Sequence, residues 1–158
     1  MRNKSKKIVN AEATEKQRMP IDEYRKMLKG FKLVSVSLAS CDAKADTSIA
    51  EEAFSQAEPL PVDIDDRTAT QRNDSKVIIS HNYKVSTKYK RKKIFELNAT
   101  FSVEFEATEG FSEEFYEIFK ESSLRLMTWP YLREFVASMT GRMQLPPLHL
   151  GLWHVPSA

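Results

Sequence analysis

The strongest constraint on the fold is a strict alternation of apolar and polar residues from Phe95 to Ala107. Every odd position in this stretch is apolar and every even position is polar, including Glu96, Glu104 and Glu106. Successive side chains alternate between two faces only in a β-strand, so the pattern predicts a strand with one apolar face and one polar, acidic face. At about 3.3 Å per residue, this strand would be roughly 43 Å long. A sheet with one wet face is normally antiparallel, which argues against a parallel βαβ architecture.

Three other segments alternate with the same period and predict the remaining strands of this sheet. They are residues 31–39, 60–65 and 77–85. In the first segment, Val34, Val36 and Leu38 should share one face. The second segment is expected to be a short edge strand, because prolines interrupt its start.

The connections between these strands are polar. Residues 40–58 have no apolar period and are expected to form a connection with a short helical turn near residues 49–54. Residues 67–75 are expected to form a polar loop with a turn, and Lys88 to Lys93 are expected to form a charged hairpin connection.

Helical signals flank the strands. Ser112 can cap a helix whose first turn is acidic, and Pro130 to Thr140 is expected to form a second helix, with Pro130 in its first turn and Gly141 as its C-cap. A weaker helix is expected from Ile21 to Leu28, after a loose basic tail. The segment 143–155 is broken by prolines and should lie extended on a surface. The predicted class is α+β, a four-stranded antiparallel sheet followed by C-terminal helices, with a tail and short helix in residues 1–29 and one domain in residues 30–158.

Composition places the chain among reduced, cytoplasmic globular proteins. It has 158 residues, one cysteine and no apolar run long enough to span a membrane. The net charge of +2 conceals alternating blocks: residues 42–66 and 94–121 each carry −7, whereas residues 67–93 carry +8. Such blocks suit neighbouring strands that attract one another, and they do not form a single basic face for nucleic acid.

Signals for catalysis or metal binding are weak. The sequence has no glycine-rich phosphate loop and no nucleophile turn, and Cys41 precedes Asp42, which would raise rather than lower the pKa of a thiol. His149 and His154 have no carboxylate nearby in the sequence, and His81 lies within a strand. We therefore expect no enzyme activity, no metal and no cofactor. Lys88 to Lys93 with its tyrosine keeps a nucleic-acid-binding regulator as an alternative.

The last 48 residues contain more apolar and aromatic side chains than one sheet face can cover, which implies an oligomer interface or a binding groove. Two motifs stand in this region, W-P-Y-L-R-E-F at 129–135 and T-G-R-M-Q-L-P-P-L-H-L at 140–150. Together with P-V-D-I-D at 61–65, they resemble the SecB family of protein-export chaperones, and most of all the SecB-like chaperones of toxin–antitoxin systems.

The resemblance implies an ATP-independent chaperone that holds non-native polypeptides for export, or alternatively one dedicated to an antitoxin. It also implies a homotetramer, built as a dimer of dimers, and a coupling to the SecA motor for which Glu104 is the candidate contact. A second C-terminal helix of the export type is not expected after Leu150, and the first strand, residues 31–41, has no acidic residue. Both points weaken the expected link to SecA. The client-binding residues that the resemblance implies are Leu60, Val62, Ile64, Phe105, Phe111, Leu148 and Leu150.

Overall fold

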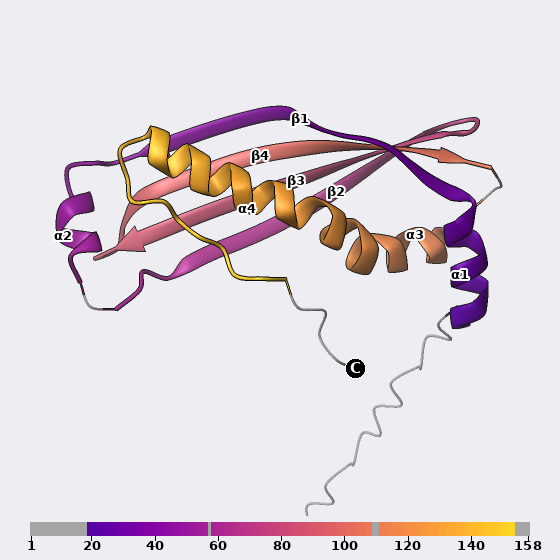
Figure 1. Ribbon diagram of the computed structural model, residues 1–158, viewed down its shortest axis with the longest axis horizontal. Helices are drawn as coiled ribbons and strands as arrows, with labels where there is room; N and C mark the ends of the chain where they lie inside the picture. The colour runs from indigo at the N-terminus through magenta and orange to yellow at the C-terminus, as the bar shows by residue number, and fades with distance from the viewer. Residues whose placement is uncertain (1–18, 57, 109–110, 154–158) are drawn as a thin grey trace, which may run out of the picture.

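The computed structural model describes residues 19–56, 58–108 and 111–153. Four strands form one antiparallel sheet in the order β1-β4-β3-β2. Helix α4 runs along the length of this sheet, and α1 lies beside α3 at one end (Figure 1). The predicted α+β class is therefore confirmed. The elements are α1 (Ile21–Lys29), β1 (Phe31–Ala45), α2 (Ala50–Phe54), β2 (Val62–Asn73), β3 (Lys76–Tyr89), β4 (Lys92–Ala107), α3 (Glu113–Phe119), the π-helical turn η1 (Lys120–Leu124) and α4 (Arg125–Arg142).

The basic tail before residue 19 and His154 lie outside the described residues. No helix of the described chain is both long and apolar enough to cross a membrane. The division of the chain at residue 29 stays a prediction. Helix α1, which ends next to this division, packs through Tyr24, Met27 and Leu28 on the same core as β1.

Strand β4 lies between β1 and β3, and its alternation is the basis of the core. From Phe95 to Ala107, the odd-numbered side chains are buried beneath the helices, as the sequence predicts. The core has two clusters. One lies under α4 and includes Leu97, Trp129 and Leu132. The other lies under α3 and includes Phe31, Phe105, Phe115 and Phe119.

The predicted loop at residues 67–75 is wrong, because β2 continues to Asn73. Pairing with β3 is unbroken as far as Asn73↔Lys76, and the turn is confined to residues 74 and 75, with Asp74 at φ 48°. The polar residues of this half-strand lie on an edge strand, where only backbone pairing on one side is required. The hairpin between β3 and β4 is likewise tighter than predicted, with only Lys90 and Arg91 in the turn, at φ 46° and 67°.

The predicted second helix begins earlier than Pro130. The π-helical turn η1 joins α3 to α4, so the chain is helical from Glu113 to Arg142 and Pro130 lies inside α4. The proline is tolerated because only the carbonyl of Leu126 loses its helical donor, and Leu126 lies on the exposed side at 50%. Gly141 is not the C-cap. The C-cap is Met143, and Gln144 follows it with φ 60°. The predicted Ser112 cap is confirmed, since its Oγ accepts from the Phe115 N–H at 3.2 Å.

Strand β1 is longer than predicted and has two register shifts, between Leu33 and Ser35 and between Leu38 and Ser40. The first shift removes Val34 from the expected apolar face and leaves its side chain 57% exposed. Leu33 and Leu38 pair with Phe105 and Phe101, and directly paired residues share a face, so both point to the helix side of the sheet. They nevertheless remain 48% and 44% exposed, because the described elements leave these two positions of the edge uncovered.

Candidate functional site

Strand β2 forms the second edge of the sheet, opposite β1, and pairs only with β3 within the described chain. Every second β2 residue faces the helices, since its β3 partner does so. This row changes character along the strand, from apolar to polar and then to cationic. Its members are Val62, Ile64, Asp66, Thr68, Thr70 and Arg72.

The C-terminal segment 143–153, which we call the strap, has no regular secondary structure beyond a turn at its start and runs back beside α4 toward β2 (Figure 1). Side chains of α4 hold it at three points. Thr140 Oγ1 accepts from the Leu148 N–H at 2.9 Å, Arg133 Nε donates to the Leu150 carbonyl at 2.8 Å, and Trp129 Nε1 donates to the Gly151 carbonyl at 2.9 Å. The extended tail that the sequence predicts is therefore present and is fixed in place through its backbone.

The structure brings five of the seven predicted client-binding residues together. The β2 side contributes three residues and the strap contributes two, and all five pack on the core cluster under α4. Of these, only Leu150 is fully buried, at 5% exposure. The other two predicted residues belong to the cluster under α3. The five are Leu60, Val62, Ile64, Leu148 and Leu150.

Burial separates the predicted client-binding residues that reach the surface from those that do not. Phe105 is completely buried and stacks on Phe31 at 4.3 Å between ring centroids, so it supports the sheet from beneath. Phe111, two residues before α3 begins, is partly exposed. Leu152, at 67% exposure, is the most exposed large apolar side chain of the strap, and the sequence prediction omitted it from the binding set.

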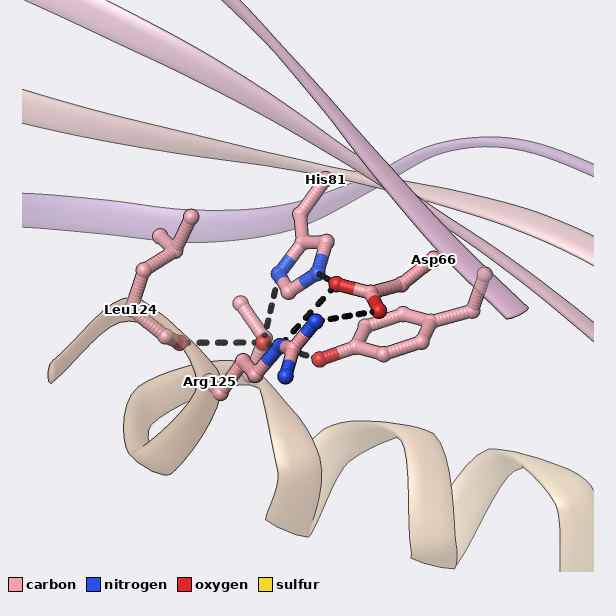
Figure 2. A network of polar contacts seen from close by, with 6 residues as sticks. Asp66, His81, Leu124 and Arg125 are labelled. Carbon is pink, nitrogen blue, oxygen red and sulfur yellow. Dashed lines mark hydrogen bonds and ion pairs between the residues drawn. The ribbon is translucent and has the colours of Figure 1, made fainter. Parts of the chain in front are cut away.

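A polar network lies between β2 and α4 beside this surface (Figure 2). His81 of β3 is completely buried, and its Nε2 lies 2.8 Å from Asp66 Oδ2 of β2. Its Nδ1 lies 3.0 Å from Thr128 Oγ1 of α4, which also contacts the Tyr83 hydroxyl at 2.7 Å. Arg125 donates to both oxygens of Asp66, at 3.1 and 2.7 Å. The network therefore fixes the distance between the edge strand and the long helix.

Burial determines the protonation behaviour of this network. Burial lowers the pKa of His81 and outweighs the opposing effect of the Asp66 carboxylate. Burial also raises the pKa of Tyr83 to about 12. A carboxylate only accepts hydrogen bonds, so His81 Nε2 carries the proton that points to Asp66, and Nδ1 faces the Thr128 hydroxyl. The order of acid, imidazole and hydroxyl matches that of a nucleophilic triad. However, Thr128 is completely buried, so its hydroxyl cannot reach a substrate.

Arg125 connects the network to the strap. Its guanidinium lies 4.9 Å from the centroid of the Trp153 ring, and Trp153 packs on Trp129 at 5.3 Å between centroids. The Trp153 indole N–H is buried and has no hydrogen-bond acceptor among the described residues. Sequence reasoning missed this network. The one available signal was Asp66, a charged residue on the helix-facing side of the strand.

The other charged candidates lie elsewhere. In the basic hairpin, Lys88 lies 3.5 Å from Asp63, while Lys90 and Lys93 pair with Glu52 and Glu96. These acids offset much of the positive charge that a phosphate backbone would require. Glu104, the candidate contact for SecA, lies on the polar face of the sheet. Its Oε1 forms an ion pair with Lys76 Nζ at 2.7 Å. No group of three or more potential metal ligands exists among the described residues.

No protein-family model matches the sequence, and no curated protein does. The fold, however, resembles that of a solved structure, the SecB-like chaperone Rv1957 of Mycobacterium tuberculosis in complex with a ChAD peptide from the Rv1956 HigA1 antitoxin. The TM-score is 0.71 at 18% identity, covering 84% of this chain and 97% of that one. A protein of unknown function from Streptococcus agalactiae is a weaker match, with a TM-score of 0.39 at 13% identity, covering 77% of this chain and 97% of that one. The chain therefore has a SecB-like fold, as the sequence resemblance predicted.

Proposed function

We propose that this chain is an ATP-independent chaperone that holds non-native polypeptides in the cytoplasm, without enzymatic activity and without a cofactor. The observation that carries the proposal is the surface between β2 and the strap. There, partly exposed apolar side chains lie beside a strand edge that pairs with nothing in the described chain. The SecB-like fold supports it, since a solved structure with this fold holds a peptide.

Such a surface suits an extended, unfolded client. A free strand edge offers backbone hydrogen bonds to any sequence, and apolar pockets beside it take alternate side chains. Burying one aliphatic side chain contributes about 1.5–3 kcal/mol, whereas ordering a disordered segment costs roughly 2–5 kcal/mol. Several contacts are therefore required. The proposed contacts are Leu60, Val62, Ile64, Phe111, Leu148 and Leu152, with Phe105 and Leu150 supporting them from below.

An antitoxin is the second, narrower candidate client. It is favoured by the solved neighbour, whose bound peptide comes from an antitoxin. A role in export would use SecA, for which Glu104 remains our proposed contact. Glu104 is 29% exposed and already paired with Lys76, so SecA would have to compete with that lysine. Binding assays with purified SecA and with an antitoxin peptide would separate these two candidates.

We also propose a homotetramer, arranged as a dimer of dimers. Leu33, Val34 and Leu38 of β1 are between 44% and 57% exposed, and Leu126 and Tyr131 of α4 are about half exposed. Exposed apolar side chains in such number mark an association surface on a chain of this size. Sedimentation at micromolar concentration should give four times the mass of one 18.2 kDa chain. A monodisperse monomer would contradict the assembly but leave the client surface intact.

The test of the holding function is suppression of aggregation of a chemically unfolded protein, measured by light scattering without ATP. The full chain should suppress aggregation at near-stoichiometric amounts. A double variant, Val62→Asp with Leu148→Asp, should lose most of this activity. Ile78→Asp is the matched control, because Ile78 is also partly exposed but lies on the opposite face of the sheet, paired with Glu104. Equal activity of the double variant and the wild type would sink the proposal.

A further inference from the structure

A hollow of about 490 Å³ lies on the helix side of β2, beyond the apolar end of the candidate surface. It is lined by β2, by α3 and by the first residue of η1, and it contains two cations and three hydroxyl groups. The lining residues are Thr68, Thr70, Arg72, Glu113, Tyr116 and Lys120. Resting on the proposed function, we infer that this hollow is an acidic-residue subsite of the client surface, which binds an Asp or Glu side chain of an extended client paired with β2.

The guanidinium of Arg72 is held in an orientation that suits binding of a carboxylate. It lies 3.8 Å from the centroid of the Tyr116 ring, and Tyr116 is almost completely buried at 2% exposure. Stacking on a fixed ring orients the guanidinium plane and leaves its N–H edge available for a carboxylate, which it can bind through two parallel hydrogen bonds. The Arg72 side chain remains 39% exposed, so its edge reaches solvent.

Glu113 already shows that a carboxylate fits against this guanidinium. One oxygen of Glu113 lies 2.9 Å from Arg72 Nη2, but the Glu113 side chain is 80% exposed. An ion pair with a partner so exposed contributes little, so a client carboxylate can replace it at small cost. Lys120 adds the second cation. Its Nζ lies 2.5 Å from Glu117 Oε1, but the Glu117 side chain is 63% exposed, so this ion pair also contributes little and can be displaced. Thr68 and Thr70 line the rest of the hollow along β2 and add hydroxyl groups to its polar surface.

The geometry of β2 predicts how far apart the acidic residue and the apolar anchor of a client should be in its sequence. Ile64 and Arg72 face the same side of β2 and are eight positions apart in the strand. At about 3.4 Å per residue, they are separated by roughly 27 Å. A client strand paired with the β2 edge has the same repeat. Its acidic residue should therefore follow or precede its apolar anchor by eight positions, and an odd spacing would point the acid to the opposite face.

The experiment uses fluorescently labelled 14-residue peptides and the full chain, with binding followed by anisotropy at low salt. Each peptide has leucine as the anchor and one test residue, glutamate or glutamine, eight positions away. Both orders of anchor and test residue are made, because β2 can pair in either direction. A third peptide places the glutamate seven positions away. The wild-type chain should bind the eight-spaced glutamate peptide about fivefold more tightly than the glutamine peptide, and the seven-spaced one like the glutamine peptide.

Variants assign the effect to the hollow. Arg72→Gln with Lys120→Gln should bind the glutamate and glutamine peptides equally. Arg67→Gln is the matched control and should keep the fivefold preference, since Arg67 lies on the other face of β2, paired with Asn82. Glu113→Gln should bind the glutamate peptide more tightly, because its competing carboxylate is removed. The single variant Lys120→Gln leaves the stack of Arg72 on Tyr116 intact. A partial loss of the glutamate preference in this variant would show that the loss in the double variant does not come from misfolding. Arg72→Glu should instead prefer a peptide with lysine at the test position.

Two results would overturn the inference, and they differ in what they say of the proposed function. If the wild-type chain binds the glutamate and glutamine peptides tightly and equally, the acidic subsite is wrong and the client surface stands. If no peptide binds and aggregation is not suppressed, the proposed function fails and the subsite fails with it.

Discussion

The two edges of this sheet differ in nearly every respect. β1 is interrupted by two register shifts and exposes leucine and valine side chains that no described helix covers. β2 has no register shift over 12 residues and exposes a row that runs from apolar through acidic to cationic. Bulges are a known way of limiting pairing at a sheet edge. The shifts in β1 interrupt its backbone ladder, so its exposed apolar side chains suit a fixed partner such as a second copy, whereas the regular β2 edge suits backbone pairing with a variable, extended one.

The largest effect we expect concerns Trp129, which supports the strap beside β2. Trp129 is 8% exposed, packs on Trp153 and donates to the Gly151 carbonyl. Trp129→Ala should therefore lower the free energy of unfolding by about 3–5 kcal/mol and loosen the strap. Chemical denaturation measures the first effect and client binding the second. Full stability with lost client binding would instead make Trp129 a client contact.

The next prediction tests the β1 side. Replacing Leu33 and Leu38 together by Asp places two charges on the exposed apolar edge. If a second chain covers this edge, each lost apolar contact costs about 1.5–3 kcal/mol, so the tetramer should dissociate at micromolar concentration. Analytical ultracentrifugation measures the mass. Lys32→Asp is the control, because it adds an acid to a polar position paired with Glu106 on the wet face. An unchanged mass in the double variant would place the interface elsewhere.

The double variant Val62→Asp with Leu148→Asp makes the converse test at β2. Client binding should weaken at least tenfold, which corresponds to about 1.4 kcal/mol, while the oligomer persists. The remaining binding should depend little on salt, since the contacts are apolar. A steep salt dependence that survives the two changes would point to the basic hairpin, 88–93, and would revive the nucleic-acid alternative.

The contrast also explains what sequence could and could not predict. β4 pairs on both sides and covers the core with one face, so burial imposes its alternation and the sequence shows it. The second half of β2 needs only backbone pairing on one side. Thr68, Thr70 and Arg72 allow this pairing, although their polar sequence is typical of a loop. Val34 was misplaced for a related reason, because a bulge on an edge strand leaves no mark in a period-two pattern.

The sequence predicted apolar residues of the candidate surface but not its long-range polar contacts. Leu60, Val62, Ile64 and Leu148 pack on one core cluster, and their role as client contacts stays a prediction. The contact between Asp66 and Arg125 joins residues 59 positions apart, and no local pattern reports such a pair. Pro130 misled the helix prediction because η1 carries the helix into α4 from upstream, so a proline that suits a first turn lies in the interior.

The smallest expected effect concerns pH and acts on the β2 side alone. Burial lowers the pKa of His81 in the folded chain below its usual value of 6.5. The unfolded chain therefore binds a proton on this histidine at a higher pH than the folded chain does. The contribution of neutral His81 to stability is complete above about pH 6.5 and is lost as the pH falls from there toward the lowered pKa. The groups facing His81 are Asp66, Tyr83, Arg125 and Thr128, and only Asp66 would offset a positive imidazolium.

We therefore expect the free energy of unfolding, measured by urea denaturation, to decrease between pH 6.5 and 5, and client binding to weaken in parallel as β2 loosens from α4. The β1 part of the proposed assembly surface should be unaffected over the same range, because β1 lies at the opposite edge of the sheet from β2, which carries Asp66. His81→Gln keeps a polar side chain but cannot titrate, so its stability should be lower and should change less between these pH values. If the oligomer dissociates with the same midpoint as the loss of client binding, the two edges do not act independently.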